Sequence, residues 1–285
     1  MPGAAPKRKR KIKLSSISVP PQLVEPFTRA WQHKELIRAV ARREFVSRFR
    51  GSMLGPLWAV LSPLIMMLAY TTMFSLTLPE LAAPTGITNY AANIFVGLIM
   101  FNMFSELAYR APMLLHEHVN FVKKSIFPSE TIAWTVTIRG LTYAGVAFLV
   151  FVVFRLVTGG SLHWTIIFVP FIIVPYTLFI LGVVWFLMAL GAFTRDVAHV
   201  MASILPILMF GTPVFYNFSQ VPGNLSIWLR LNPIGDYVEM MRDITLHARL
   251  PNPIGYLVVV AVSYAVFLLG YQFFMRYKSV IVDVI

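Results

Sequence analysis

The chain has 285 residues, of which 58% are hydrophobic and 13% are charged, and its mean hydropathy is +0.72. Soluble domains carry about a quarter of their residues as charged side chains, so this composition indicates a membrane protein. The absence of cysteine excludes disulfides, thiolate metal sites and cysteine nucleophiles. The formal net charge of +12 is mainly a signal of membrane topology, and contact of its basic run with anionic lipid headgroups is a simpler explanation than nucleic-acid binding.

The chain begins with a strongly basic region. Residues 1–28 include a KRKRK run, and we predict that they form a basic cytoplasmic tail. In residues 29–53, apolar residues recur at helical spacing between basic ones, which predicts an amphipathic helix. This helix cannot cross a bilayer, because it contains the arginines Arg38, Arg42, Arg43, Arg48 and Arg50. The pattern is typical of a helix that lies in the membrane interface.

Six later stretches are apolar enough to cross a bilayer, for which a helix needs about 20 residues. We predict an all-α polytopic membrane protein whose residues 54–285 form a six-span domain, with spans at 54–78, 90–109, 131–157, 164–193, 197–215 and 254–275. Thirteen lysines and arginines precede the first span, and cytoplasmic segments carry the excess of positive charge. Six spans place both termini on one side, which is therefore predicted to be the cytoplasm.

The segment 112–129 is a cytoplasmic loop in this topology. It mixes charged and apolar residues, and a fully solvated loop does not need the apolar ones. A short amphipathic helix would use them to dock into a soluble partner or to rest on the lipid surface, and the sequence leaves both open. Its His116 and His118 are more consistent with a solvated pair than with a metal site, and no metal site is predicted elsewhere.

The segment 216–252, between the fifth and sixth predicted spans, is expected to be extracytoplasmic. Its apolar runs are too short to cross, but they can enter the membrane and return where their backbone is buried in protein. Glu239 and Arg242 are three residues apart, which places them on one helix face, and Asp236 flanks them. Charges at this depth are often functional, whereas an ion pair that stabilises a re-entrant hairpin is the simpler interpretation.

Aromatic residues form 14% of the chain. Most aromatics of a membrane protein face lipid or pack inside it, and a minority line a path for sugar rings. The candidates for such a path are Trp58, Tyr70, Phe74, Phe210, Phe215 and Tyr216. Arg139 is a strongly basic residue well inside a predicted span, and it either extends to the interface or binds a phosphate group.

An interfacial helix that leads into a bundle of spans points to membrane transport. The chain contains no G-x-x-x-x-G-K-[ST] motif, so it lacks the phosphate loop of many ATP-binding proteins. No acidic residue lies at the middle of a predicted span, where a proton- or sodium-coupled carrier usually has one. The energy for transport is therefore predicted to come from a separate subunit, and no catalytic residue is predicted here.

Four segments resemble the membrane subunit of bacterial type-2 ABC exporters, in the branch that exports O-antigen, capsular polysaccharide or teichoic acid. The interfacial helix and first span of that branch are similar to REFVSRFRGSMLGPLWAVLSPLIMMLAYTTMFS (43–75). Its coupling segment is similar to NFVKKSIFPSE (120–130), and its fifth-span entry to FTRDVAHVMASILPILMFGTPVFY (193–216). Its re-entrant motif is similar to LNPIGDYVEMMRDITL (231–246). The resemblance covers nearly the whole chain after its first thirty residues.

This resemblance implies a homodimeric permease in the bacterial inner membrane that works with two copies of a separate ATPase subunit. That subunit would bind ATP and Mg, so no cofactor is expected in this chain. It would push on the coupling segment, where the expected contacts are Glu117, Phe121, Lys123 and Lys124. The substrate would be a lipid-linked polysaccharide, with its diphosphate at the five arginines and its glycan along the six aromatics. Membrane lipids are further partners, and nucleic acid is not expected.

Other functions stay open. A type-2 exporter of small hydrophobic molecules is the first alternative, but it explains poorly a basic interfacial helix beside an aromatic-rich path. A membrane-embedded glycosyltransferase or acyltransferase would need acidic or histidine clusters, and docking or hairpin structure explains the clusters present better. A non-transporting scaffold would not need re-entrant segments.

Overall fold

The computed structural model of the chain describes residues 21–77, 86–119, 128–218, 221–223 and 229–285, and all regular secondary structure in them is helical. The helical segments that are long and apolar enough to cross a membrane are Gly55–Met73, Ile87–Glu117, Thr131–Val157, Trp164–Phe193 and Pro253–Ile281. The prediction of an all-α polytopic membrane protein is confirmed.

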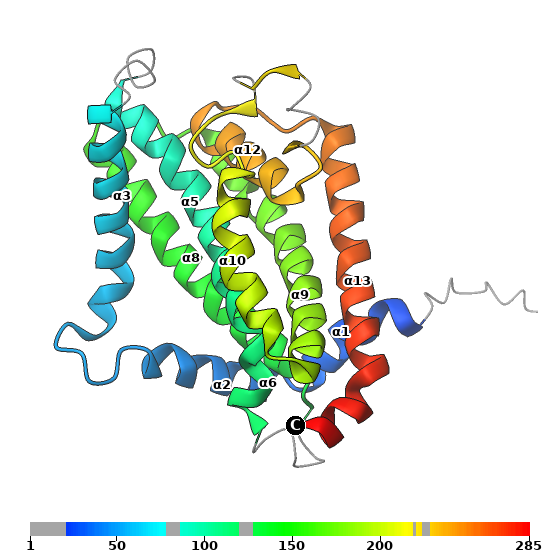
Figure 1. Cartoon of the computed structure of the whole chain (residues 1–285). Helices are drawn as coiled ribbons and strands as arrows, with labels where there is room; N and C mark the ends of the chain where they lie inside the picture. Colours follow the sequence, from blue (N-terminus) through cyan, green and yellow to red (C-terminus); the bar gives the residue numbers. More distant parts are fainter. Residues whose placement is uncertain (1–20, 78–85, 120–127, 219–220, 224–228) are drawn as a thin grey trace, which may run out of the picture.

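Long helices form a bundle, and shorter helices lie at its two ends and within it (Figure 1). The long helices are α3 (Trp58–Thr77), α5 (Ile87–Arg110), α8 (Thr131–Val157), α9 (Val169–Phe193) and α13 (Pro253–Val284). The shorter ones are α1 (Pro21–Gln32), α2 (Lys34–Ser47), α6 (Leu114–Glu117), α10 (Asp196–Phe210) and α12 (Pro233–Leu246). Short 3-10 helices precede α3, α6 and α9 at Gly55–Leu57, Ala111–Met113 and Trp164–Phe168. We call the end with α1, α2 and α6 the lower end, and the end with α12 the upper end (Figure 1).

The fifth predicted span is shorter than expected. The sequence predicts a span over 197–215, whereas α10 ends at Phe210 after 15 residues. Pro213 follows soon afterwards, and proline cannot donate to the hydrogen-bond ladder of a helix. The carbonyl of Val214 accepts a 2.6 Å hydrogen bond from the Arg242 side chain of α12 instead. A tertiary contact thus holds the chain in a turn where hydropathy alone predicts a longer helix.

The N-terminal region forms two helices where the sequence predicts one. Because α1 begins at Pro21, the predicted boundary between a tail (1–28) and an interfacial helix (29–53) falls inside α1. The two helices adjoin at His33 and run across the lower end of the bundle (Figure 1). α2 buries Ile37 and Ala41 and packs mainly on α8. The basic run of the predicted tail lies outside the described residues.

The closest helix packing in the bundle is between α9 and α13. Gly182 of α9 lies directly against the backbone of Val266 and Phe267 in α13. Gly270 of α13 in turn lies against the backbone of Gly182. Small residues at these positions let the two helix backbones approach, which is a common way to pack helices in membranes.

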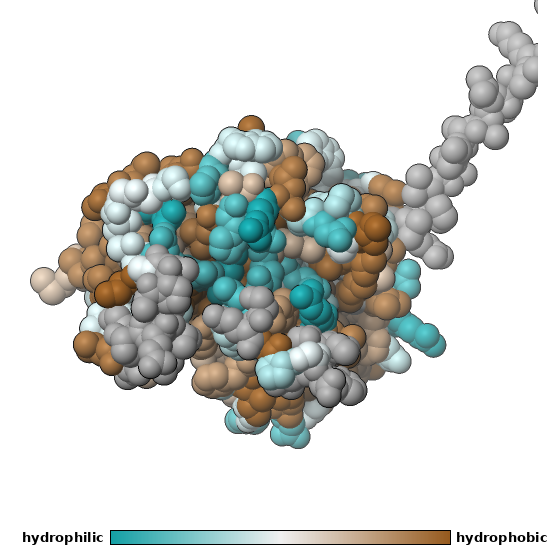
Figure 2. Space-filling model, turned by 90° about the horizontal axis from the view of Figure 1, so that it is seen from above, coloured by the Kyte–Doolittle hydropathy of each residue, from teal (hydrophilic) through white to brown (hydrophobic). Residues whose placement is uncertain are grey.

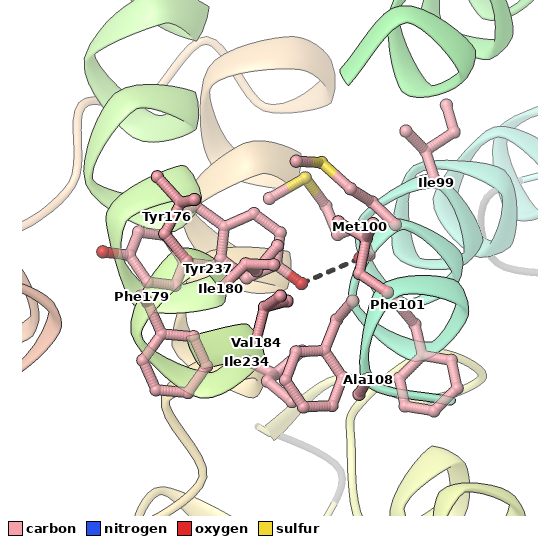
Figure 3. Packing of buried hydrophobic residues seen from close by; sticks show 14 of the residues in the cluster. Ile99, Met100, Phe101, Ala108, Tyr176, Phe179, Ile180, Val184, Ile234 and Tyr237 are labelled. Carbon is pink, nitrogen blue, oxygen red and sulfur yellow. Dashed lines mark hydrogen bonds between the residues drawn. The ribbon is translucent and has the colours of Figure 1, made fainter. Parts of the chain in front are cut away.

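Another side of α9 packs against α5 and α12. The Tyr176 hydroxyl donates a 2.8 Å hydrogen bond to the carbonyl of Met100 in α5 (Figure 3). The Tyr176 ring also packs on Tyr237 of α12, with ring centroids 4.8 Å apart. Both tyrosines are fully buried. A buried hydroxyl without a hydrogen bond is unfavourable, so the bond to Met100 stabilises Tyr176 in the core.

The sides of the bundle are largely apolar. From the upper end, hydrophilic residues are seen across the centre and hydrophobic residues around the rim (Figure 2). Within this chain, only 6% of the membrane-crossing window of α3 is buried, compared with 78% for that of α5. α3 therefore presents most of its apolar surface to lipid or to another protein.

The close approach of α9 and α13 predicts that Gly182→Ala destabilises the fold. The added methyl group would meet the backbone of α13, which cannot move aside as a side chain can. Overpacking of this kind costs about 1–3 kcal/mol, which lowers the Tm measured in detergent. Gly145→Ala in α8 is the control, because its methyl group meets no atom within 4 Å. Equal melting temperatures for the two variants would contradict this packing.

Candidate functional site

A cavity of about 1180 Å³ lies between α2, α3, α5, α8 and α10. Its lower part is lined by charged side chains, namely Glu44, Arg48, Glu106, Arg110, Glu117, His118 and Arg139. Its remaining wall is mostly apolar and includes Trp58, Met66, Leu98, Ile99, Met103, Leu205 and Met209. The cavity is therefore amphipathic, with its charge at the end where α2 crosses the bundle.

Glu44 of α2 is at the centre of the charged end. One carboxylate oxygen lies 2.7 Å from Nη1 of Arg139 in α8, and the other lies 3.2 Å from Nε2 of His118, just after α6. Both Glu44 and Arg139 are mostly buried, with 12% and 4% of their side chains exposed. A buried carboxylate needs cationic or hydrogen-bonding partners, so Glu44 holds three separate elements together.

Arg139 is buried within the chain, where the carboxylates of Glu44 and Glu106 lie close by, the latter 4.0 Å from Nη2. Its contact with Glu44 brings it to α2, the helix that is predicted to lie in the membrane interface. Extension of Arg139 to the interface stays a prediction. A phosphate-binding role for Arg139 stays a prediction.

Arg48 forms a second connection between α2 and the bundle. Its Nη1 lies 2.8 Å from the Glu106 carboxylate in α5, and its guanidinium lies 4.6 Å from the ring centre of Tyr143 in α8. Phe45 stacks on the same ring at 5.2 Å. Cation–π and ring contacts add to the ion pair, so the C-terminal half of α2 is fixed to two long helices.

Electrostatic effects at the charged end favour the ionised forms of its acid and its histidine. The hydrogen bond with Glu44 raises the pKa of His118, although burial opposes the shift. Burial alone would raise the pKa of Glu44, but the hydrogen bond with His118 and the charge of Arg139 hold it below its ordinary value. The His118–Glu44 contact is therefore stabilised as an ion pair.

Three of the predicted glycan-path aromatics lie together nearer the upper end. The ring of Tyr70 in α3 lies 5.5 Å from that of Phe215, and Phe215 lies 6.3 Å from Phe210 at the end of α10. Tyr216 donates a 2.9 Å hydrogen bond to the carbonyl of Phe210. Trp58 is separate from this group and lines the cavity. The side chain of Phe74 lies outside the described residues.

The five predicted head-group arginines separate into two sets. Arg48 lines the cavity, whereas Arg38, Arg42, Arg43 and Arg50 are exposed and do not line it. Of the predicted coupling residues, Glu117 lies on the cavity wall, 2.9 Å from Arg110. Phe121, Lys123 and Lys124 lie outside the described residues.

The predicted hairpin residues surround the turn after α10. Arg242 is fully buried and donates hydrogen bonds to the carbonyls of Val214, Asn93 and Tyr216, at 2.6, 3.1 and 3.0 Å. The Glu239 carboxylate lies 3.6 Å from Arg242.

The two acids among the predicted hairpin residues, Glu239 and Asp236, differ in their surroundings. Glu239 accepts a 3.2 Å hydrogen bond from the backbone N–H of Phe218. Burial raises the pKa of the Asp236 carboxyl to about 6. Arg242 and Glu239 thus connect α12 to α5 and to the end of α10; a re-entrant position in the membrane stays a prediction.

Sequence reasoning missed the acids that organise the site, namely Glu44 and Glu106. A signal was present for each: Glu44 is one of two acids in a mainly basic helical segment, and Glu106 is the charged residue of the second predicted span. His118 was expected to be a solvated residue but is mostly buried, with 13% of its side chain exposed. Among the described residues, no three metal-ligating side chains converge.

Comparison with known families identifies the class of protein. Residues 35–246 match the family described as ABC-2 type transporter. The match covers most of the chain, so the chain belongs to this family of membrane proteins, as the sequence resemblance predicts. It begins within α2 and ends at the last residue of α12, so it includes every element that lines the cavity.

Individual relatives are similar over most of their length. The chain is 26% identical to the O-antigen export system permease protein RfbA of Myxococcus xanthus over 235 residues, or 82% of this chain and 88% of the relative. A protein of the same name from Klebsiella pneumoniae is 26% identical over 76% of this chain and 82% of its own length. The polysialic acid transport protein KpsM of Escherichia coli is 24% identical over 74% and 81%. These relatives agree with the polysaccharide-export branch of the family.

The His118–Glu44 contact predicts a pH-dependent contribution to stability. Because the pKa of His118 is raised in the folded chain, its stabilising effect is complete below about pH 6.5, the ordinary pKa of histidine, and is lost as the pH rises through the raised value. We expect His118→Gln to lower the Tm in detergent more at about pH 6 than at about pH 9. His163→Gln, at the upper end, is the control for replacing a histidine away from this contact. A pH-independent difference for His118→Gln would contradict a charged pair.

Proposed function

We propose that this chain is the membrane-spanning subunit of an ATP-driven ABC transporter that exports a lipid-linked surface polysaccharide across the bacterial inner membrane. Membership of the ABC-2 type transporter family supports the transport role. Relatives named for O-antigen export and for polysialic acid transport support the polysaccharide as cargo. The cavity described above is the structural observation in this chain that supports the proposal most directly.

The cavity matches the chemistry of a lipid-linked glycan. Such a molecule joins an apolar lipid to a polar glycan through an anionic diphosphate. Arg48 and Arg139 lie at the charged end, where a phosphate would find guanidinium donors of suitable geometry. The apolar wall formed by α3, α5 and α10 suits the lipid, and the Tyr70, Phe210 and Phe215 group suits sugar rings further up.

The exposed arginines in and just after α2 have a different role in this proposal. Arg38, Arg42, Arg43 and Arg50 face away from the cavity and contact phospholipid headgroups, which positions α2 in the interface. They also raise the local concentration of anionic lipids near the cavity. Arg48 then contacts the substrate diphosphate inside it.

A second copy of the chain completes the channel in this account. α3 is barely buried within one chain, and α10 exposes Val200, Ile204, Ile207 and Phe210. α3 and α10 border the same cavity, so a homodimer that pairs these two helices would enclose a path between two copies.

Energy comes from two copies of a separate ATPase subunit, which bind ATP and Mg. The ATPase subunit contacts the coupling segment, residues 112–129, and transmits force to it through Glu117, Phe121, Lys123 and Lys124. In this account the lower end of the bundle faces the cytoplasm, so both termini are cytoplasmic. The His118–Glu44 ion pair passes movement of the segment to α2 and hence to the cavity.

A type-2 exporter of small hydrophobic molecules is the second candidate. The cavity wall contains Met66, Met103 and Met209, and flexible methionine side chains suit binding of varied apolar ligands. This alternative does not explain the concentration of charge at the lower end of the same cavity.

Deletion of the gene in its host separates the two candidates. We expect finished lipid-linked glycan to accumulate on the cytoplasmic side of the inner membrane, with loss of surface O-antigen or capsule, because the polymer can no longer cross. Glycan is quantified on each side, and re-expression of the wild-type chain is the control. Normal surface glycan together with new sensitivity to small toxic compounds would reject polysaccharide export and favour the second candidate.

A further inference from the structure

A second buried carboxylate, Glu130, lies at the lower end of the bundle, outside the cavity. It immediately precedes α8, and only 3% of its side chain is exposed. Its carboxylate lies 2.6 Å from Nζ of Lys278 in α13 and 2.8 Å from Nη1 of Arg29 in α1. Its backbone carbonyl accepts a 3.1 Å hydrogen bond from Nε1 of Trp185 in α9. One residue thus contacts three helices that are distant in the sequence.

An aromatic cluster continues this contact into the core. Phe27 of α1 lies 6.2 Å from Trp134 of α8 and 5.0 Å from Phe267 of α13, measured between ring centres. Trp185 lies 6.1 Å from Trp134 and 5.4 Å from Phe267. The ring of Phe27 and the charge of Arg29 therefore hold α1 against the bundle, so α1 is not part of a free tail.

The charges in this cluster favour a fixed geometry. Burial alone would raise the pKa of Glu130, but the hydrogen bonds with Lys278 and Arg29 hold it below its ordinary value. Replacing a buried ion pair by apolar residues is often neutral for stability, whereas removing one partner leaves the other charges uncompensated. What the ion pairs specify is the relative position of α1, α8 and α13.

The cluster lies at one end of the proposed coupling segment. Within the described first part of the segment, His118 binds Glu44 of α2. The described residues on the two sides of positions 120–127 therefore include one ion pair with α2 and, at Glu130, one with α1. α1 and α2 adjoin at His33, so both ends are connected to one N-terminal pair of helices.

We propose that Glu130, Arg29 and Lys278 form a positioning cluster that makes α1, the start of α8 and the end of α13 move as one body when the ATPase partner acts on the chain. This inference rests on the proposed function, because it assigns these residues to the transmission of force. α1 then transmits movement to α2, and through Glu44 to the wall of the cavity.

Coupling is tested by Glu130→Gln in the full transporter reconstituted in vesicles with its ATPase partner. We expect glycan export per ATP hydrolysed to fall about tenfold, while ATP hydrolysis stays within about twofold of wild type. Glu25→Gln is the matched control, because Glu25 is an exposed partner of the same Arg29, at 2.8 Å, and its loss should leave the ratio unchanged. If export and hydrolysis fall together with the Tm, Glu130 has only a structural role and the proposal is overturned.

A second measurement does not depend on export. Because the chain has no native cysteine, spin labels attach only at introduced cysteines, here Trp31→Cys in α1 and Val280→Cys in α13, whose native side chains are 72% and 45% exposed. We expect one narrow distance that does not change when ATP is added, and a broadened distribution after Lys278→Met. A distance that changes with ATP in the otherwise wild-type chain would overturn the proposal. If the distance is narrow and unchanged by ATP but the wild-type chain exports no glycan, the proposed function is rejected, while the movement of these helices as one body is supported.

Discussion

Two buried carboxylates determine how the lower end of this protein is built. A carboxylate that leaves water is stable only with cationic or hydrogen-bonding partners. Glu44 obtains them from α8 and from the residue after α6, and Glu130 obtains them from α1 and α13. Every N-terminal helix is thereby fixed to the bundle at a defined place. The amphipathic cavity exists because α2 is fixed by this charge network over the space between α3, α5, α8 and α10.

The upper end uses the same principle with the sign reversed. Arg242 is buried and is surrounded by backbone carbonyls from the turn after α10 and from α5. It holds the turn after α10 in place, next to the aromatic group of Tyr70, Phe210 and Phe215. Charged residues therefore hold both ends of the bundle, while the helices between them are positioned by apolar packing such as that of Gly182 on α13.

Much of the fold was predictable because hydropathy is a local property. The predicted span at 131–157 has the same bounds as α8, since the apolar run there is bounded by Glu130 and by Thr158 and Gly159. Pro213 is a local signal for the early end of α10, but the hydrogen bond that holds the turn after it comes from Arg242, 28 residues further along the chain, and no local pattern predicts it. The site was predicted less completely. Arg48 and Trp58 do line the cavity, but the partner of Arg139 is 95 residues away in α2, and no local pattern pairs the two.

We propose above all that the cavity holds the lipid-linked glycan. A photo-crosslinking amino acid in place of Asn102, on the cavity wall, tests it directly, with Leu149 on the outer face of α8 (64% exposed) as the comparison. After ultraviolet irradiation of cells that make the glycan, the adducts at each position are identified by mass. The account predicts lipid-linked glycan attached at position 102 and phospholipid alone at position 149. Phospholipid alone at both positions would contradict it.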